Sequence, residues 1–543
     1  MAPKHDSSGR EIQKPALPVL KKMLADTTDI NLLTLFWCIH AIQDGRASKV
    51  KPKHLAYPKQ AVTTDMTSPL VSYKWELETL ITLMLNHPKT NQPPWLQKSL
   101  LTHDFNAMAD LANTLRTVED EQSAARIDVS NIMLEMHRIG HRQFQWQQGW
   151  GRAGDIYRYL FIYGQGECAD YFYQTNGVSL IDFVSVAFAF YVLLQEQPWA
   201  GKLTGLSIMG LDDSLVDKVL PLLADEIWNV RRDSLRLLKQ VEKGLGVELP
   251  IIYQPSYLRV KPILRSGAYN TYIAPLPELI LMRATVGLYY DVIRGGTKII
   301  NDANARFEEY ARHSIKAQCP AFDPAPAVKY TYNKNDVDTP DVLLKHEGRI
   351  VAVFECKATK LTFEAQYGDD PVENARNGYA QMAKAIFQLW KFFSHVRRGI
   401  INLDVAEDAV GVVLTMDAWT QMGGQLRERL FRDAEALAAG KDKDITEEDK
   451  RHPVFCAIHD LDELLATSSE EHLLTAFKAA TTEKYKTWGV REVRQEEADP
   501  LPERKPFPFD LGDLFPWWKT LPEGYRRSKD ENGKTLITKE EAV

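Results

Sequence analysis

Side chains that could bind a metal ion and activate water occur together in one short segment, TPDVLLKHEGRIVAVFECKATK. Two apolar runs flank a polar turn, which predicts a β-hairpin. If the turn centres on Gly348, Asp341 faces Glu355, and alternation places Lys357 on the same face of the strand as Glu355. Directly opposed Cβ atoms lie ~5 Å apart, so both carboxylates could reach one ion.

These charges predict a cation site at the strand end. Adjacent carboxylates repel each other and lose hydration on burial unless a cation joins them. Mg²⁺ prefers oxygen ligands and is commonly held by one or two carboxylates together with phosphate oxygens. We therefore expect Asp341, Glu355 and the backbone carbonyl of Cys356 to hold Mg²⁺, for which Mn²⁺ could substitute. Lys357 would orient or help to deprotonate the attacking water.

The same residues resemble the PD-(D/E)xK nuclease superfamily, which includes restriction endonucleases and Holliday-junction resolvases. The dipeptide Pro340-Asp341 matches the PD element, and the tripeptide from Glu355 to Lys357 matches the E-x-K element. The resemblance covers roughly residues 250–480. It implies a restriction-endonuclease-like fold and metal-dependent hydrolysis of a phosphodiester, with DNA favoured over RNA as the substrate.

Two flanking helices carry further matches. Phe307-Glu308, in the expected helix 303–317, resembles the "FE" of the family's first core helix, which implies that Glu308 is a metal ligand. Glu309 is the competing choice, because the sequence does not fix the phase of the helix. Gln381, in the expected helix 375–393, resembles the catalytic Gln that some branches use near the metal or phosphate.

Weaker candidates for nucleic-acid contact lie elsewhere. Lys360, just beyond the second strand, is either a phosphate contact or a solubilising surface charge. Arg142 and Trp146 belong to a segment that mixes arginines with aromatic residues, a blend that suits single strands or a protein partner. Buried packing between helices is the alternative for that segment. His137 and His141 have the spacing of a zinc pair, but no third ligand is evident, which favours a structural pair.

The elements that must position the site form a mixed sheet flanked by helices in the C-terminal half. Strands are expected from Asp341, Arg349, Gly411 and Pro453. Before them, apolar residues recur at helical spacing. We therefore predict three regions: 1–245, mainly α-helical with a break near 91–125; 250–485, an α/β (α+β) nuclease domain; and 486–543, a polar Pro-rich tail with an aromatic anchor.

Composition sets outer limits on the function. The 543 residues have the apolar and charged content of a globular protein, and their net charge of −7 gives no general attraction for a polyanion. The five scattered cysteines fit neither a disulfide framework nor a zinc finger, and no secretion signal is visible, so we expect a cytoplasmic protein. The longest apolar run, residues 183–194, is shorter than the ~20 residues of a membrane span, so no membrane partner is expected.

These observations favour a Mg²⁺-dependent nuclease whose helical N-terminal region recognises a trigger or substrate, a protein partner or a second copy of the chain. The resemblance suggests an effector of bacterial anti-phage defence. The alternative is a catalytically inactive nuclease fold that binds nucleic acid or acts as a scaffold in a complex. A helical regulator that uses its C-terminal domain only for self-association is a third class.

Overall fold

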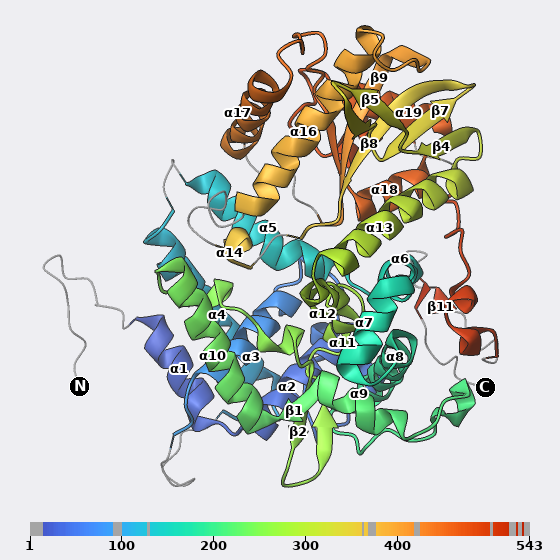
Figure 1. Cartoon of the computed structure of the whole chain (residues 1–543). Coiled ribbons are helices and arrows are strands. Elements are labelled where there is room, and N and C mark those ends of the chain that lie inside the picture. The colour runs from blue at the N-terminus through green and yellow to red at the C-terminus, as the bar shows by residue number, and fades with distance from the viewer. Residues whose placement is uncertain are drawn as a thin grey trace, which may run out of the picture. The chain divides into compact units, whose positions relative to one another are not determined.

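The computed structural model divides into two compact units (Figure 1). It describes residues 15–90, 100–127, 131–360, 363–367, 376–417, 424–499, 503–520, 528–529 and 535–536. Unit 1 consists of Met1–Glu135, Arg142–Trp150 and Asp182–Gly287; unit 2 consists of Met136–His141, Gly151–Ile181 and Leu288–Val543. The boundary expected at 245–250 therefore falls within unit 1, and a stretch of the expected helical region belongs to unit 2.

Unit 1 is mainly helical, as predicted. Its helices are α1 (Ala16–Asp26), α2 (Asp29–Ile42), α3 (Lys74–Asn86), α4 (Phe105–Ala124), α9 (Leu215–Leu223), α10 (Ile227–Leu245) and α11 (Glu278–Ala284), with most of α8 (Leu180–Glu196). A small sheet has the order β1 (Ala224–Glu226), β2 (Ile263–Ser266), β3 (Thr271–Ile273). Of the break expected near 91–125, residues 105–124 form one continuous helix, and residues 91–99 lie outside the described part of the chain.

The buried helix α2 shows why this region folds as helices. The Thr28 side chain accepts a hydrogen bond from the backbone N–H of Asn31 and so caps the first turn. Nearly every residue from Leu32 to Ile42 is buried. A helix that is apolar on all sides is stable only when other elements surround it, so α2 forms part of the core of unit 1.

Unit 2 contains a five-stranded mixed sheet in the order β10-β9-β8-β7-β4. The strands are β4 (Phe322–Pro326), β7 (Val342–His346), β8 (Arg349–Lys357), β9 (Val405–Thr415) and β10 (Val454–Ala457). The last three run parallel, while β7 is antiparallel to both β8 and β4. All but β4 were expected from the sequence. The sequence did not predict β4, because it contains Pro324 and Pro326. Proline is tolerated there because β4 lies at the edge of the sheet.

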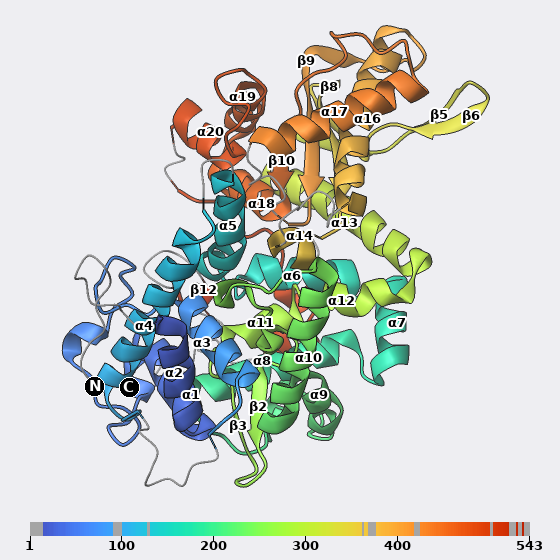
Figure 2. The ribbon, with the colours of Figure 1, turned by 90° about the vertical axis from the view of Figure 1, so that its left-hand side faces the viewer.

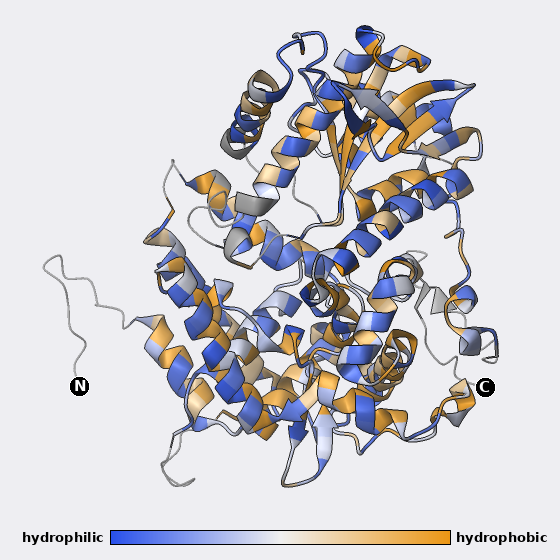
Figure 3. Ribbon diagram, in the orientation of Figure 1, coloured by the Kyte–Doolittle hydropathy of each residue, from blue (hydrophilic) through white to orange (hydrophobic). Residues whose placement is uncertain are grey.

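Helices cover both faces of this sheet. The expected helices 303–317 and 375–393 are confirmed as α13 (Thr297–Gln318) and α16 (Arg376–Arg397); the others here are α17 (Gly424–Lys441), α18 (Ile458–Thr467) and α19 (Glu470–Ala480). Val353 and Val413 belong to a core shared with α16 and α17, whereas Phe354 contacts Phe477 of α19 on the opposite face. Figure 3 shows the strands of this sheet as largely hydrophobic, consistent with burial on both sides.

The remaining elements of unit 2 are short. They are α6 (Ala153–Tyr163), α7 (Gly166–Asn176), α12 (Leu288–Val292), α14 (Phe363–Tyr367), α20 (Val490–Glu497), β5 (Lys329–Tyr332), β6 (Asn335–Asp338), β11 (Ser528–Lys529) and β12 (Thr535–Leu536). Figure 2 shows the β5–β6 hairpin extending past the sheet. The aromatic anchor of the tail packs onto unit 2, because Phe507 and Phe509 contact the Tyr157 ring of α6.

Two sequence expectations concern cysteines and membranes. All five cysteines are free and buried. Among the described residues, no single helix is long and apolar enough to cross a membrane. The helices α7 and α8 meet that criterion only together, as a pair separated by a sharp bend.

The helix α5 (Ile132–Gln148) is shared between the two units.

Candidate functional site

A two-residue turn sets the register of the β7–β8 hairpin. His346 pairs with Arg349, and the two residues between them, Glu347 and Gly348, have φ values of 50° and 85°. Both values lie in the left-handed region, as a type I′ turn requires. Val351 of β8 has no partner in β7, so the register shifts by one residue at this bulge. The turn is thus centred half a residue earlier than predicted, and the bulge restores the predicted register beyond it.

The restored register brings the predicted residues together. Val342 pairs with Phe354, so the chain continues with Asp341 beside the Glu355–Cys356 segment. The Asp341 Oδ2 atom accepts a 2.6 Å hydrogen bond from the Cys356 backbone N–H. Burial first, and then the nearby carboxylates, raise the pKa of the Cys356 thiol well above its usual range. A protonated thiol is no nucleophile, so Cys356 contributes backbone atoms only.

Glu355 and Lys357 form a buried ion pair at the end of β8. The Glu355 side chain is 2% exposed, and its Oε1 accepts a 2.6 Å hydrogen bond from the Lys357 ammonium. The other carboxylate oxygen, Oε2, is buried and has no hydrogen-bond partner among the described residues. A buried carboxylate oxygen without a donor is costly, so this atom is suited to a cation or a donor that joins later.

Three carboxyl groups of this region have raised pKa values, and burial is the main cause for each. Burial raises the pKa of Glu355 to about 7; Lys357 opposes the shift, while Asp341 and Glu308 add to it. Burial likewise raises the pKa of Asp341, against the charge of Lys357. For Glu308, burial and then the charge of Asp341 raise the pKa to about 7. The nearby positive charge of Lys357 and Arg312 therefore does not outweigh the burial of the three carboxyl groups. We name Asp341, Glu355, Glu308 and Lys357 the Glu355 cluster.

The structure fixes the helix phase that the sequence left open. The charges of Asp341 and Lys357 act on Glu308 of α13. Glu309 instead lies 3.9 Å from His313, and its side chain is 40% exposed. Arg312, four residues after Glu308 and therefore on the same helical face, also acts on Glu308 and Asp341. Arg312 was not predicted, although its spacing from Glu308 was a usable signal.

The predicted Gln381 is not joined to the Glu355 cluster. It is exposed on α16 and makes no hydrogen bond within the described part of the chain. The same helix presents a different cation: burial lowers the pKa of Lys391, and the charge of Glu355 opposes that shift. Helical spacing could not have indicated Lys391, because ten residues place it about 80° around the helix from Gln381.

The Lys360 side chain is buried and paired inside unit 2 and does not lie at the surface. Its ammonium is buried and donates to Asp417 Oδ1 at 3.0 Å and to the Tyr159 hydroxyl at 3.2 Å. It also lies over the Tyr159 and Tyr289 rings. A side chain held in this way joins the ends of β8 and β9 to α6 and α12 and is not presented to a phosphate, which corrects the sequence expectation.

The aromatic and basic segment of α5 is interior. In unit 1, Arg142 is buried and donates to Glu119 at 2.7 Å, and the Trp146 indole donates to Glu78 at 2.7 Å. The packing alternative therefore describes both residues better than nucleic-acid contact does. In unit 2, His137 and His141 are buried with ring centroids 4.4 Å apart, and burial lowers the pKa of His141 to about 3. No third zinc ligand joins them among the described residues.

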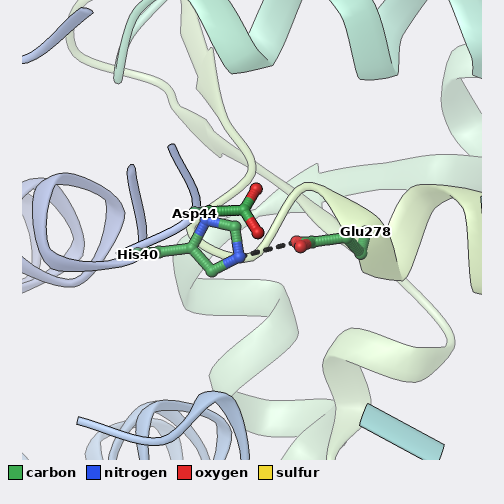
Figure 4. A group of neighbouring side chains, drawn as sticks. All are labelled: His40, Asp44 and Glu278. Carbon is green, nitrogen blue, oxygen red and sulfur yellow. Dashed lines mark ion pairs between the residues drawn. The ribbon is translucent and has the colours of Figure 1, made fainter. Parts of the chain in front are cut away.

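A second carboxylate cluster occurs in unit 1 and was not predicted. Ligand atoms of His40, Asp44 and Glu278 lie within 4.8 Å of one another (Figure 4). The Lys74 ammonium contacts Asp44 Oδ1 at 2.7 Å and Glu278 Oε1 at 2.5 Å. Arg46 contacts Asp44 at 3.3 Å and donates to His40 Nδ1 at 2.6 Å, which leaves the His40 proton on Nε2, facing Glu278.

This His40 cluster, which we define as His40, Asp44, Glu278, Lys74 and Arg46, is already neutral. Burial alone would raise the pKa of Glu278, but its close contacts with His40 and Lys74 lower it well below its usual range. Two carboxylates are balanced by two permanent cations, and His40 has no lone pair to offer. The cluster joins α2, α3 and α11 as a structural network, and its donor set does not suit a metal ion.

The Glu355 cluster offers the opposite donor set. Its candidate ligands are the oxygen atoms of Asp341, Glu355, Glu308 and the Cys356 carbonyl, and oxygen ligands suit a hard cation such as Mg²⁺. The buried Glu355 Oε2 without a donor fits the same ion. Among the described residues, its three carboxylates are not gathered within 4.8 Å as those of the His40 cluster are. No family model matches the chain, and no curated protein or solved structure matches it either.

Proposed function

We propose that this protein is a Mg²⁺-dependent nuclease that hydrolyses phosphodiester bonds, with DNA favoured as the substrate. The observation that carries the proposal is the buried Glu355, which shares one oxygen with Lys357, keeps the other without a partner and has a pKa raised to about 7. Burial destabilises the ionised carboxylate unless a cation neutralises it. Strongly shifted pKa values of this kind are common at functional sites.

Each residue then has a separate task. Asp341, Glu355 and the Cys356 carbonyl would hold the metal ion, and Glu308 would add a further carboxylate from α13. When bound, such an ion would lower the pKa of a water molecule and neutralise charge on the phosphate. Burial alone would lower the pKa of Lys357, but the charge and hydrogen bond of Glu355 raise it, so Lys357 remains an ammonium. As a donor, it would orient the water and stabilise the charge that develops on the phosphate oxygens.

The order of elements supports this proposal. The helix α13 precedes the β7–β8 hairpin, and α16 connects β8 to the parallel strand β9. This is the helix, hairpin, helix and strand sequence that the resemblance to PD-(D/E)xK nucleases implies. A restriction-endonuclease-like fold for residues 297–457 is therefore part of the proposal.

Cleavage assays with the full chain test it. Supercoiled plasmid, linear DNA and RNA are incubated with the wild type, Asp341→Ala and Lys357→Ala in Mg²⁺ or Mn²⁺. Loss of a positioned proton donor or acceptor typically lowers rates by about 10² to 10⁴-fold, so Lys357→Ala should show a loss of that order. Lys443→Ala, at an exposed lysine of unit 2 without a partner among the described residues, is the matched control and should cleave like the wild type.

The inactive alternative gives a different result. If the wild type cleaves none of the three substrates with either metal, yet binds nucleic acid equally well with and without Asp341, the nuclease proposal fails. The protein would then be a nucleic-acid-binding or scaffold protein. Thermal unfolding of each variant separates loss of activity from loss of structure.

A further inference from the structure

The helix α10 of unit 1 carries a row of basic residues on its exposed face. Its buried face is formed by Val230, Ser234, Leu238 and Val241, at spacings of four and three residues. The opposite face presents four exposed cations at similar spacings, which we name the cationic row: Arg232, Arg236, Lys239 and Lys243. Figure 3 shows hydrophilic residues along much of this helix.

The positive charge of this row is only partly compensated. Asp233 accepts ion pairs from Arg232 at 2.9 Å and Arg236 at 3.3 Å. Lys239 and Lys243 have no acidic partner among the described residues. Because the whole chain has a net charge of −7, this row is a local concentration of positive charge and not a consequence of a basic composition.

An exposed tryptophan continues the row by one turn. Trp228 is 60% exposed, and the Arg232 guanidinium lies 5.4 Å from its ring centroid. The indole N–H donates to Glu226, which fixes the ring beside the row. A large aromatic ring held at the surface next to cations is the combination that binds bases and phosphates together.

We propose that the cationic row and Trp228 bind single-stranded nucleic acid. From Arg232 to Lys243 the helix rises ~16 Å, long enough for several phosphates of an extended strand. Trp228 would stack on a base at one end of that track. A duplex keeps its bases stacked inside, and an acidic protein offers no base to the ring, so both would use the cations but not the tryptophan. The surface lies outside the Glu355 cluster and needs no metal ion.

Binding without cleavage tests the row. Fluorescence anisotropy of a labelled 20-nucleotide DNA strand is measured in EDTA over a range of salt concentrations. The variant Arg236→Gln/Lys239→Gln/Lys243→Gln should lower the slope of log K against log salt by about 2 and the affinity on the order of 100-fold at 0.1 M salt, because each phosphate contact on a single strand contributes about 0.7 to the slope.

A matched control removes the same charge elsewhere in unit 1. Lys51, Lys53 and Lys59 are exposed lysines close together in the sequence, and their triple Gln variant should change the affinity less than about threefold. Equal losses in the two triple variants would show that only net charge matters and would overturn the proposal. Absence of binding by the wild type would overturn it as well.

Trp228 separates a nucleic acid from an acidic protein. Trp228→Ala should weaken binding about tenfold, whereas Trp228→Phe should restore most of it, because any aromatic ring can stack on a base. If Trp228→Ala binds like the wild type and polyglutamate competes as well as the oligonucleotide, the surface serves an acidic protein and the proposal is wrong. Because binding is measured in EDTA, where no metal-dependent cleavage occurs, failure of the nuclease proposal and failure of this one remain distinguishable.

Discussion

The His40 cluster of unit 1 and the Glu355 cluster of unit 2 are both groups of largely buried carboxylates, but they differ in compensation. In the first, Lys74 contacts both Asp44 and Glu278, and Arg46 adds a second cation. In the second, Lys357 makes a close ion pair with Glu355, while Arg312 and Lys357 act on Asp341 and Glu308 without an ion-pair contact among the described residues. The first looks more like a metal site by distance alone, because its ligand atoms lie within 4.8 Å.

The directions of the pKa shifts favour the Glu355 cluster as the metal site instead. Glu278 has a pKa well below its usual range, since His40 and Lys74 outweigh its burial. Glu355 and Glu308 have pKa values raised to about 7, since burial outweighs the charges that oppose it. A cluster whose carboxylates are already balanced by lysine and arginine is structural. A cluster whose carboxyl groups stay partly protonated near neutral pH lacks positive charge, which a bound cation would supply. Compensation therefore distinguishes the two better than proximity does.

The largest expected difference is in stability. Glu278→Gln leaves the partly exposed Lys74 with Asp44 alone of its two carboxylates. Breaking a fully buried pair destabilises by about 3–5 kcal/mol, and we expect a loss near the lower end, about 3 kcal/mol. Urea unfolding of the full chain in EDTA measures it, with Glu447→Gln, at an exposed glutamate, as the control. A loss below about 1 kcal/mol would mean that the His40 cluster does not hold unit 1 together.

The equivalent change in the other cluster should have the opposite sign. Glu355 has a pKa of about 7 against an ordinary 4.5, so its ionised form destabilises the metal-free fold by up to about 3 kcal/mol at pH 8. Loss of the Lys357 hydrogen bond offsets part of this, and we expect Glu355→Gln to stabilise by about 1–2 kcal/mol in EDTA. Thermal unfolding at pH 8 compares the stability of Glu355→Gln with that of the wild type. If the variant is less stable, the Glu355 carboxylate is already compensated in the metal-free fold.

The sequence predicted the features that local patterns determine, and it did not predict those that depend on packing between distant segments. The β7–β8 hairpin was predictable, because alternation and a Gly turn are local signals, and even the facing of Asp341 and Glu355 followed from them. The bulge at Val351 was not visible, yet it preserved that register. The phase of α13 needed tertiary contacts, which is why Glu308 and Glu309 could not be separated.

Buried polar residues were the main failure of the sequence interpretation. Lys360 was expected at the surface, and Arg142 and Trp146 were named as candidate nucleic-acid contacts with buried packing as the alternative. All three have their polar groups paired inside a unit. The His40 cluster combines residues more than 200 positions apart, His40 and Glu278, and no local pattern indicates such a pair. Composition cannot show which charges are paired, because pairing depends on packing between distant segments.

Metal affinity should depend on pH in the Glu355 cluster. A carboxyl whose pKa is raised on folding stabilises the fold while protonated, below about pH 4.5, and this stability is lost as the pH rises through about 7. Because bound Mg²⁺ needs the ionised form, its affinity should fall about tenfold per pH unit below 7 for each proton displaced. Calorimetric titrations at pH 6 and 8 test this; equal affinities at both would contradict a pKa near 7.

The smallest expected effect concerns the turn that sets the site register. Gly348 has φ +85°, and a Cβ there would meet no atom within 4 Å, so Gly348→Ala adds backbone strain without a clash. We expect a loss of about 1 kcal/mol in stability. Gly440→Ala, in the helix α17 and also in open space, is the control and should stabilise slightly. If both substitutions have the same sign, the left-handed turn is not what holds the hairpin.

The most direct test of the central claim is Mn²⁺ binding followed by electron paramagnetic resonance in the wild type, Glu355→Gln and Asp44→Asn. The uncompensated Glu355 cluster should hold the ion, so Glu355→Gln should lose Mn²⁺ binding while Asp44→Asn keeps it. Loss of binding in Asp44→Asn with retention in Glu355→Gln would place the ion in the His40 cluster and contradict the account.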